Sequence, residues 1–415
     1  MLMEIGEADI PVVKADPSLS EAERREELHR LTGQHWIAKA DLGYIVTTYE
    51  DCATMLRDRR WHSALSLIAE TQNYSSDEWS SRPQRRSILS TEGDDHSRIR
   101  RIVSPAFTPK SADRLRPFMR NVVNELLDPI CALGTSEFVT DVCEPYPIPI
   151  ICELLGAPRE DWALFSRLAV EIFKLFNGNL ERDAPAIIAA SDEMDSYMLA
   201  LIADRRAQPR DDLLSDLIAA EEEGDRLSTD ELLSMANAIL LAGTDTTRNQ
   251  LGCAVALFAQ HPRQFEALRS QPELVPQAVE EVMRYLGAVR GTGRFASEEI
   301  TYRDLVFPKG TLIFPNFVAA NHDIEKFDEP LTFDIGRSSS APHLTFGSGI
   351  HYCLGAFLAR AELQEAFTVI ADRMPGLELN GDISWKPMQN GIWGPERLPV
   401  PVSYTHLTLP TILLV

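Results

Sequence analysis

The chain has 415 residues, of which 44% are hydrophobic and 25% are charged, as in an ordinary globular protein. Its formal net charge of −22 argues against nonspecific binding to nucleic acid. No apolar run could span a bilayer, no signal peptide is recognisable, and the six cysteines form no CxxC pair. We therefore expect a cytoplasmic protein with no membrane anchor, no structural zinc site and no disulfide scaffold.

Helical patterns dominate the first half of the chain. Residues 20–31 begin with a polar cap and acidic residues, and residues 35–47 predict a strand pair that turns at Asp41-Leu42-Gly43. Three prolines (Pro145, Pro147 and Pro149) predict a break in the helical region. Amphipathic stretches predict further helices at residues 110–133, 161–176, 184–206 and 211–222.

The segment Ser228-Thr-Asp-Glu231 is a capping box, which predicts a helix from there to about Gln260. The centre of this helix, residues 239–247, contains Gly243 and four hydroxyl or acidic residues. Glycine disfavours a helix interior by about 1 kcal/mol, and Thr and Asp compete for backbone hydrogen bonds. We therefore predict a local distortion, at a point where function is expected to lie.

The remaining elements alternate in type. We predict a helix at residues 272–286, short strands at 294–296 and 311–315, an irregular segment at 324–342 and a final helix at 354–373. Residues 402–415 contain no charged residue other than an ionisable histidine and follow a natural strand end. We interpret them as a non-native tail and exclude them from the fold.

The segment Phe346-Gly-Ser-Gly-Ile-His-Tyr-Cys-Leu-Gly355 carries the strongest chemical signal. Its three glycines allow the backbone to approach a flat ligand closely. Cys353 lies at the start of a helix, where the dipole and free N–H groups stabilise a thiolate, a good axial ligand for haem iron. The alternative is a glycine-rich loop with a buried cysteine.

The pattern FxxGxxxCxG resembles the haem-binding signature of the cytochrome P450 family, with matches at Phe346, Gly349, Cys353 and Gly355. The resemblance covers about residues 20–400. It implies a mainly α fold with one large α-rich domain over residues 1–401, in which residues 1–19 are an N-terminal extension, and a small β-rich region. It also implies haem b between the helix at 228–260 and the Cys353 helix, with Cys353 as the metal ligand.

Two further motifs occur in the family's order. Glu281 and Arg284 lie on one helix face and resemble the family's buried ExxR pair, and Arg337 resembles the residue that completes this structural network. The alternative for such a pair is a surface salt bridge of little energetic value.

The segment Ala242-Gly-Thr-Asp-Thr-Thr247 resembles the family's oxygen-activation motif. The resemblance makes Asp245 and Thr246 a catalytic acid–alcohol pair, and Ala242 and Gly243 the residues that leave room for O2. The alternative is a kinked core helix.

Haem propionates need cations near the porphyrin edge. His96 and Arg100 at i, i+4 resemble the family's propionate-binding helix, and Arg294 and His351 match its other two contacts. The remaining cofactor-binding residues implied by the resemblance are Phe346, Gly347, Gly355 and Ala242. Individually, each cation could equally be a surface charge.

The segment from Arg82 to Arg120 contains ten basic and four acidic residues in an otherwise acidic chain. Charge alone favours a solvated face. In the family this region lies on the side where the electron donor docks, so the resemblance implies docking of an acidic ferredoxin or flavodoxin-type protein. Arg98 and Arg101 are expected to point to solvent.

The resemblance implies a monooxygenase that inserts one oxygen atom of O2 into a C–H or C=C bond of a lipophilic steroid, terpenoid, fatty acid or polyketide. Two alternatives stay open. A peroxygenase would use hydrogen peroxide and would not need Asp245 and Thr246, and a haem-thiolate sensor would bind ligands without catalysis. Substrate-contacting walls are expected at residues 63–92, 165–188, 239–240, 287–293 and 390–393.

Overall fold

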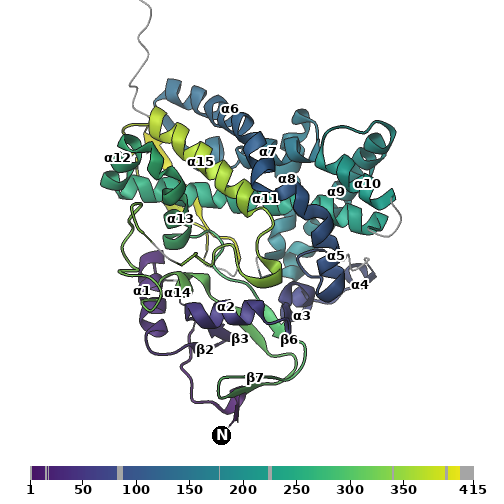
Figure 1. Cartoon of the computed structure of the whole chain (residues 1–415), viewed down its shortest axis with the longest axis vertical. Coiled ribbons are helices and arrows are strands. Elements are labelled where there is room, and N and C mark those ends of the chain that lie inside the picture. Colours follow the sequence, from purple (N-terminus) through teal and green to yellow (C-terminus); the bar gives the residue numbers. More distant parts are fainter. Residues whose placement is uncertain are drawn as a thin grey trace, which may run out of the picture.

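Helices form most of the molecule, and the strands labelled in Figure 1 lie at one end of it, near the N-terminus. The computed structural model describes residues 2–14, 16, 18–81, 87–176, 178–222, 227–338, 341–387 and 391–401. The segment interpreted as a non-native tail, residues 402–415, lies outside these ranges. The mainly α fold with a small β region, expected from the family resemblance, is confirmed.

The helices are of two kinds: the eight predicted from periodicity and capping, which are all present, and further ones that this reasoning did not predict. They are α1 (Glu21–Thr32), α2 (Tyr49–Arg57), α3 (Ile68–Thr71), α4 (Asp77–Ser81), α5 (Gly93–Val103), α6 (Pro109–Leu133), α7 (Pro147–Leu155), α8 (Trp162–Phe173), α9 (Leu180–Ala207), α10 (Leu213–Glu222), α11 (Thr229–Gln260), α12 (Pro262–Ser270), α13 (Val275–Tyr285), α14 (Phe317–Asn321) and α15 (Ala356–Arg373).

The predicted capping box at the start of α11 is present. The amide of Glu231 donates to the Ser228 hydroxyl at 3.2 Å, and the amide of Ser228 donates to the Glu231 carboxylate at 2.8 Å. These bonds satisfy two backbone donors that have no partner inside the helix. They fix where the long central helix begins.

The predicted break is present at Pro145, which lies in a turn between two helical segments, but its extension over Pro147 and Pro149 is wrong. The chain forms a π-helical turn at Val139–Cys143 and then α7, whose first residue is Pro147. Prolines are tolerated in the first turn of a helix because the N–H groups there have no intrahelical acceptor. The predicted distortion of α11 around residues 239–247 is also wrong, since the helix continues without interruption through that segment.

The main sheet has the order β2-β3-β9-β6-β4, with β3 and β9 parallel and the other neighbours antiparallel. The hairpin predicted at residues 35–47 is its β2–β3 pair. The strands are β1 (Met3–Glu4), β2 (Ile37–Ala40), β3 (Gly43–Val46), β4 (Trp61–Ser63), β5 (Thr135–Glu137), β6 (Arg294–Ala296), β7 (Ile300–Tyr302), β8 (Leu305–Phe307), β9 (Leu312–Pro315), β10 (Ser384–Trp385), β11 (Pro395–Arg397) and β12 (Pro399–Pro401).

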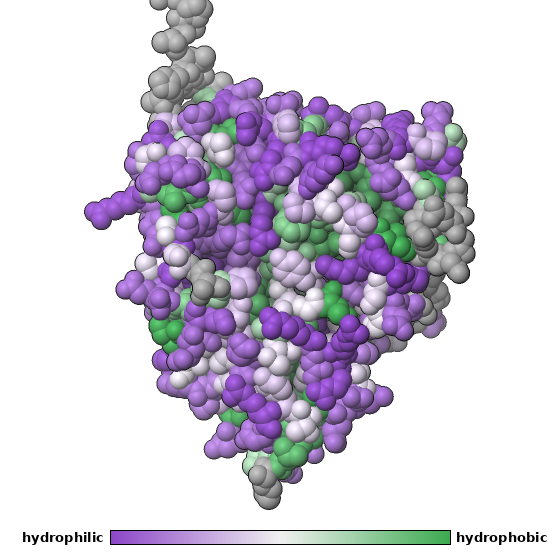
Figure 2. Space-filling view, viewed as in Figure 1, coloured by the Kyte–Doolittle hydropathy of each residue, from purple (hydrophilic) through white to green (hydrophobic). Residues whose placement is uncertain are grey.

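The largest hydrophobic core surrounds α11, which packs against α7, α9 and α15. Helix α15 lies alongside α6 (Figure 1). A second core lies between the main sheet and α2. Hydrophilic residues cover most of the face shown in Figure 2, as the composition predicts. No helix in the described part of the chain is long and apolar enough to cross a membrane.

Candidate active site

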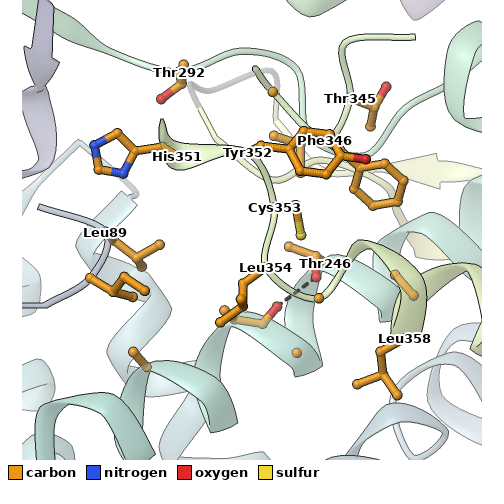
Figure 3. A pocket seen from close by; sticks show the side chains of 18 of the residues that line it. Leu89, Thr246, Thr292, Thr345, Phe346, His351, Tyr352, Cys353, Leu354 and Leu358 are labelled. Atoms are coloured by element: carbon orange, nitrogen blue, oxygen red, sulfur yellow. Dashed lines mark hydrogen bonds between the residues drawn. The ribbon is translucent and has the colours of Figure 1, made fainter. Parts of the chain in front are cut away.

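A cavity of about 320 Å³ lies between α11 and the loop that precedes α15. Cys353 enters it from the loop and Thr246 from α11 (Figure 3). The predicted site residues that line it are Ala242, Gly243, Thr246, His96, Arg100, Arg294, Phe346, Gly347, His351, Cys353 and Gly355. Asp245 is the one predicted catalytic residue that does not.

The loop before α15 holds Cys353 through its backbone. The amide of Cys353 donates to the carbonyl of Phe346 at 2.9 Å, and the amide of Gly347 donates to the carbonyl of Leu344 at 2.7 Å. Gly355 is the N-cap of α15, two residues after the cysteine. The thiol therefore sits just before a helix N-terminus, as the sequence predicts.

The ionisation of Cys353 differs from the expectation of a stabilised thiolate. Burial raises the pKa of this thiol, although the amide of Gly355 and the guanidinium groups of Arg100 and Arg360 act to lower it. The effect of desolvation on the pKa is therefore larger than the effect of the helix N-terminus, because a buried thiolate without a cation at the sulfur loses its hydration. Binding of a metal ion at the sulfur would reverse this balance.

Arg294, one of the predicted propionate contacts, is a buried cation. The Arg294 side chain is 5% exposed, and its guanidinium donates to Thr292 and to the carbonyl of Gly293, both at 2.9 Å. Among the described residues no carboxylate lies within salt-bridge distance of it, and burial lowers the pKa of Arg294 to about 10. A buried cation in this position favours an anionic ligand.

His96 and His351 lie against each other, with ring centroids 4.6 Å apart. Within the described chain, Nε2 of His96 has no hydrogen-bond partner, and burial lowers the pKa of His96 to about 4, so its ring is neutral at pH 7. Nε2 of His351 lies 3.0 Å from a carboxylate oxygen of Glu92. No motif pointed to Glu92 as the partner of His351, since an acidic residue before a helix is usually a dipole-compensating charge.

The basic residues of α5 do not all behave as expected. Arg100 donates to the carbonyls of Ile350 and Tyr352 at 3.2 and 2.7 Å, which ties α5 to the cysteine loop. The prediction that Arg98 points freely to solvent is wrong, because it pairs with Glu231 at the start of α11. Arg101 is exposed as predicted.

The residues of the predicted oxygen-activation motif separate onto two sides of α11. The Thr246 hydroxyl donates to the carbonyl of Ala242 at 2.7 Å and lies on the cavity wall. Asp245 forms an ion pair with Arg248, and Nζ of Lys386 lies 3.9 Å from its carboxylate. The structure therefore brings the alcohol to the cavity and holds the acid outside it.

Gly243 allows α7 to approach α11. A Cβ at this position would overlap the side chain of Ile151. The absent side chain thus makes room for a neighbouring helix, in addition to any space that it leaves in the cavity.

Glu281, Arg284 and Arg337 form the predicted network in the core. Nε of Arg284 lies 2.7 Å from the Glu281 carboxylate, and both side chains are 3% exposed. Nε of Arg337 lies 3.1 Å from the same carboxylate. Arg284 also donates to the carbonyl of Asn321 at the end of α14 and to those of Pro330 and Thr332 in the irregular segment before the cysteine loop.

Only some of the segments predicted as substrate-contacting walls line the cavity. Ser63, Leu65, Ile88 and Leu89 lie on them, as do Ile239 and three residues of the 287–293 segment. Among the described residues of 165–188 and 390–393, none lines this cavity, and residues 177 and 390 lie outside the described ranges. Several lining residues lie outside all the predicted segments, and Glu362 is the acid among them.

The cavity combines a thiol on the loop before α15 with an alcohol on the facing long helix. Its wall also carries buried cationic and imidazole groups. These are the groups that a haem-thiolate type of site requires. The family model for cytochrome P450 matches residues 160–373. Cytochrome P450 CYP107DY1 of Priestia megaterium is 35% identical over 86% of this chain and 88% of its own length. The mycinamicin IV hydroxylase/epoxidase of Micromonospora griseorubida is 36% identical over 86% of this chain and 89% of its own length.

The solved structure of the bacillaene polyketide synthase cytochrome P450 PksS of Bacillus subtilis superposes with a TM-score of 0.82 at 33% identity, covering 94% of this chain and 100% of its own. The chain belongs to the cytochrome P450 family. It is an oxidoreductase of the P450 monooxygenase type, a family that implies haem-thiolate iron.

The residues of the cavity fit that cofactor. Its carboxylates would meet the unpaired guanidinium of Arg294 and the free Nε2 of His96, and its iron would meet the Cys353 sulfur. Gly355 lines the cavity, and a Cβ there would have no protein atom within 4 Å. Gly355 thus leaves a bare wall for a flat ligand.

Gly349 is required by the path of the cysteine loop. Its φ is +72°, and a Cβ there would overlap the carbonyl oxygen of Leu56 on α2. We expect Gly349→Ala to lower the free energy of unfolding by at least about 2 kcal/mol, measured by chemical denaturation. Gly310→Ala is the control, because Gly310 has a similar φ of +86° with open space around it. Equal losses in both variants would show that only backbone strain matters.

Proposed function

We propose that this chain binds haem b and adds one oxygen atom from O2 to a C–H or C=C bond of a lipophilic substrate of the polyketide type. The observation that carries the proposal is the shared cavity of Cys353 and Thr246 with its mainly apolar walls, which include Ile88, Leu89 and Ile239. The polyketide class is favoured among lipophilic substrates because PksS, which has the same fold, is named for a polyketide synthase.

Bound haem would supply the activation of O2 and the electron storage that no amino-acid side chain provides. The chain's own residues do the rest. Cys353 is the proposed axial ligand, and His96, Arg100, Arg294 and His351 are the proposed propionate contacts. The Thr246 hydroxyl lies on the wall formed by α11 and donates to the carbonyl of Ala242, so its oxygen can accept a hydrogen bond from water.

The proposed substrate class is tested by titrating the haem-loaded protein with macrolactones, steroids, terpenoids and fatty acids while the spin state of the iron is monitored. We expect a spin-state shift with a macrolactone or related polyketide, followed by an oxygenated product when O2 and an electron donor are supplied. A shift and turnover restricted to fatty acids or steroids would contradict the polyketide class. Turnover with hydrogen peroxide but none with O2 and a donor would favour a peroxygenase.

We also propose that a ferredoxin or flavodoxin-type donor docks beside the cysteine loop. Helix α5 contacts this loop through Arg100. Two exposed basic residues lie nearby in the sequence, Arg101 on α5 and Lys110 at the start of α6. Within the described residues neither Arg101 nor Lys110 forms a salt bridge. The basic residues Arg114, Arg116 and Arg120 instead pair with acids of this chain, and the predicted contributors Arg82, Arg85 and Arg86 lie outside the described ranges.

Charge reversal at this surface tests the docking proposal. We expect Arg101→Glu with Lys110→Glu to slow reduction by an acidic ferredoxin at least about tenfold at low salt, since complementary charges accelerate encounter. The difference between variant and unmodified protein should shrink as ionic strength rises. Lys309→Glu changes an exposed lysine of the β-rich region and is the control. Unchanged reduction rates in the double variant would contradict the proposal.

A further inference from the structure

One carboxylate closes the base of the segment that connects β4 to α5, residues 64–91, which is called the wall segment below. Glu92, the N-cap residue of α5, accepts a hydrogen bond from the backbone amide of Ser63, the last residue of β4, at 2.6 Å. The same oxygen, Oε1, lies 3.0 Å from Nε2 of His351 on the cysteine loop. A single atom of Glu92 therefore joins both ends of the wall segment to the cysteine loop.

Burial and charge make this contact a directional one. The side chains of Glu92 and His351 are 14% and 12% exposed. Burial acts to raise the pKa of Glu92, but the hydrogen bonds from His351 and from the Ser63 amide outweigh it, so the pKa is lowered. Glu92 is therefore a carboxylate at neutral pH and can only accept hydrogen bonds. Nε2 of His351 then carries the shared hydrogen, which fixes how the imidazole ring is turned.

The first end of the wall segment is held by the main sheet. Ser63 pairs with Arg294 of β6, and the amide of Ala64 donates to the carbonyl of Gly293 at 3.1 Å. The hydrogen bond between Glu92 and Ser63 brings the second end back to this fixed point. A long connection has many conformations, and a contact at its base removes part of that freedom.

The wall segment faces the cavity, whereas Glu92 lies behind it. Leu65, Ile88 and Leu89 of the wall segment line the cavity, and so do Ser63 and His351, the two partners of Glu92. Glu92 itself is not a lining residue. It is thus placed to hold residues that face the cavity without meeting a bound molecule.

We propose that Glu92 is a positioning residue that sets the distance between the apolar wall segment and the cofactor edge of the cavity. The inference rests on the proposed function, in which haem lies beside His351 and Cys353 and the lipophilic substrate lies against the wall segment. Since one oxygen holds both parts, loss of the Glu92 carboxylate lets the wall segment move relative to the cysteine loop. The effect falls on molecules that reach the wall segment and spares ligands too small to touch it.

Hydrogen exchange tests the contact in the full-length protein as purified, without substrate or turnover. We expect the Ser63 amide to exchange at least about tenfold faster in Glu92→Ala, because it loses its acceptor. Glu92→Gln should keep most of the protection, since an amide oxygen can accept both hydrogen bonds. Glu23→Ala is the matched control, because Glu23 accepts a hydrogen bond from the Ser20 amide at 2.8 Å in the capping box of α1, and it should leave Ser63 unchanged. Equal exchange of Ser63 in Glu92→Ala and the unmodified protein overturns the proposal.

Two azole probes of different size test the position of the wall segment in the haem-loaded protein. Imidazole binds iron through one nitrogen, and 4-phenylimidazole adds a phenyl ring that extends into the apolar part of the cavity. We expect Glu92→Ala to weaken 4-phenylimidazole at least about fivefold and imidazole less than about twofold, because only the phenyl ring loses apolar contacts. Glu92→Gln and Glu23→Ala should bind both probes as the unmodified protein does. The measurement is the shift of the haem absorption band on titration.

The outcomes separate this proposal from the proposed function. Equal weakening of both probes in Glu92→Ala, or no weakening of either, contradicts a role in positioning the wall segment. If the unmodified protein binds no haem, the proposed function fails, and the exchange of the Ser63 amide still decides whether Glu92 holds the base of the wall segment.

Discussion

Replacing Cys353 by histidine is expected to abolish monooxygenase turnover and to remove the strongly red-shifted Soret band of the reduced, carbon-monoxide-bound protein. The physical reason is the charge of the ligand. A thiolate pushes electron density toward the iron and favours O–O cleavage, whereas a neutral imidazole supplies far less. The measurement is the reduced carbon-monoxide difference spectrum, combined with product formation under O2 and an electron donor.

A second cysteine, outside the cavity, provides a matched control. Cys131 on α6 is partly buried, like Cys353, but does not line the cavity. Cys131→Ser should keep both the red-shifted band and turnover. A Cys353→His protein that retained the red-shifted band would show that another residue is the thiolate ligand, and the proposed arrangement of the site would then be wrong.

Local sequence signals predicted most helices because each signal acts within a few residues. The capping box at Ser228 and Glu231 placed the start of α11 correctly, and the cysteine pattern placed the loop before α15. The prediction failed at Pro147 because a proline breaks a helix interior but begins a helix readily. It failed at Gly243 because the packing of Ile151 from α7 compensates the low helix propensity, and no local rule contains that contact.

The site could be predicted as a set of residues but not as an arrangement. The family motif implied that Asp245 and Thr246 act as an acid–alcohol pair. Only the structure shows that Asp245 instead pairs with Arg248. Glu362 had a detectable signal. The cavity-facing positions 355, 358, 359, 362 and 363 follow helical spacing, and Glu362 is the only acid among them. Its ionisation could not be read from the sequence, because burial in the folded chain raises the pKa of Glu362 to about 8.

The second large effect is expected at Glu281. Glu281→Gln leaves Arg284 and Arg337 without their carboxylate, and Arg284 is 3% exposed. Removing one partner of a buried ion pair costs about 3–5 kcal/mol, because the remaining charge stays desolvated. We expect a loss of this size in chemical denaturation, accompanied by loss of haem from the native protein. The cause is that the network anchors the segment that leads into the cysteine loop.

The surface pair Glu266 and Arg269 is the matched control, since it has the same i, i+3 spacing and a 2.7 Å contact but a carboxylate that is 64% exposed. Glu266→Gln should change stability by no more than about 1 kcal/mol. Equal effects of the two glutamine variants would mean that spacing, not burial, determines the energy.

Arg284→Lys separates charge from geometry in this network. Lysine keeps the positive charge but cannot donate simultaneously to the Glu281 carboxylate and to the carbonyls of Asn321, Pro330 and Thr332. If the planar guanidinium is what joins α13 to the irregular segment, Arg284→Lys should lose nearly as much stability as Glu281→Gln. Near-normal stability and haem retention in the lysine variant would instead reduce the network to simple charge compensation. The first result is expected, because three backbone carbonyls from three different positions converge on one side chain and no ammonium group presents donors in that planar arrangement.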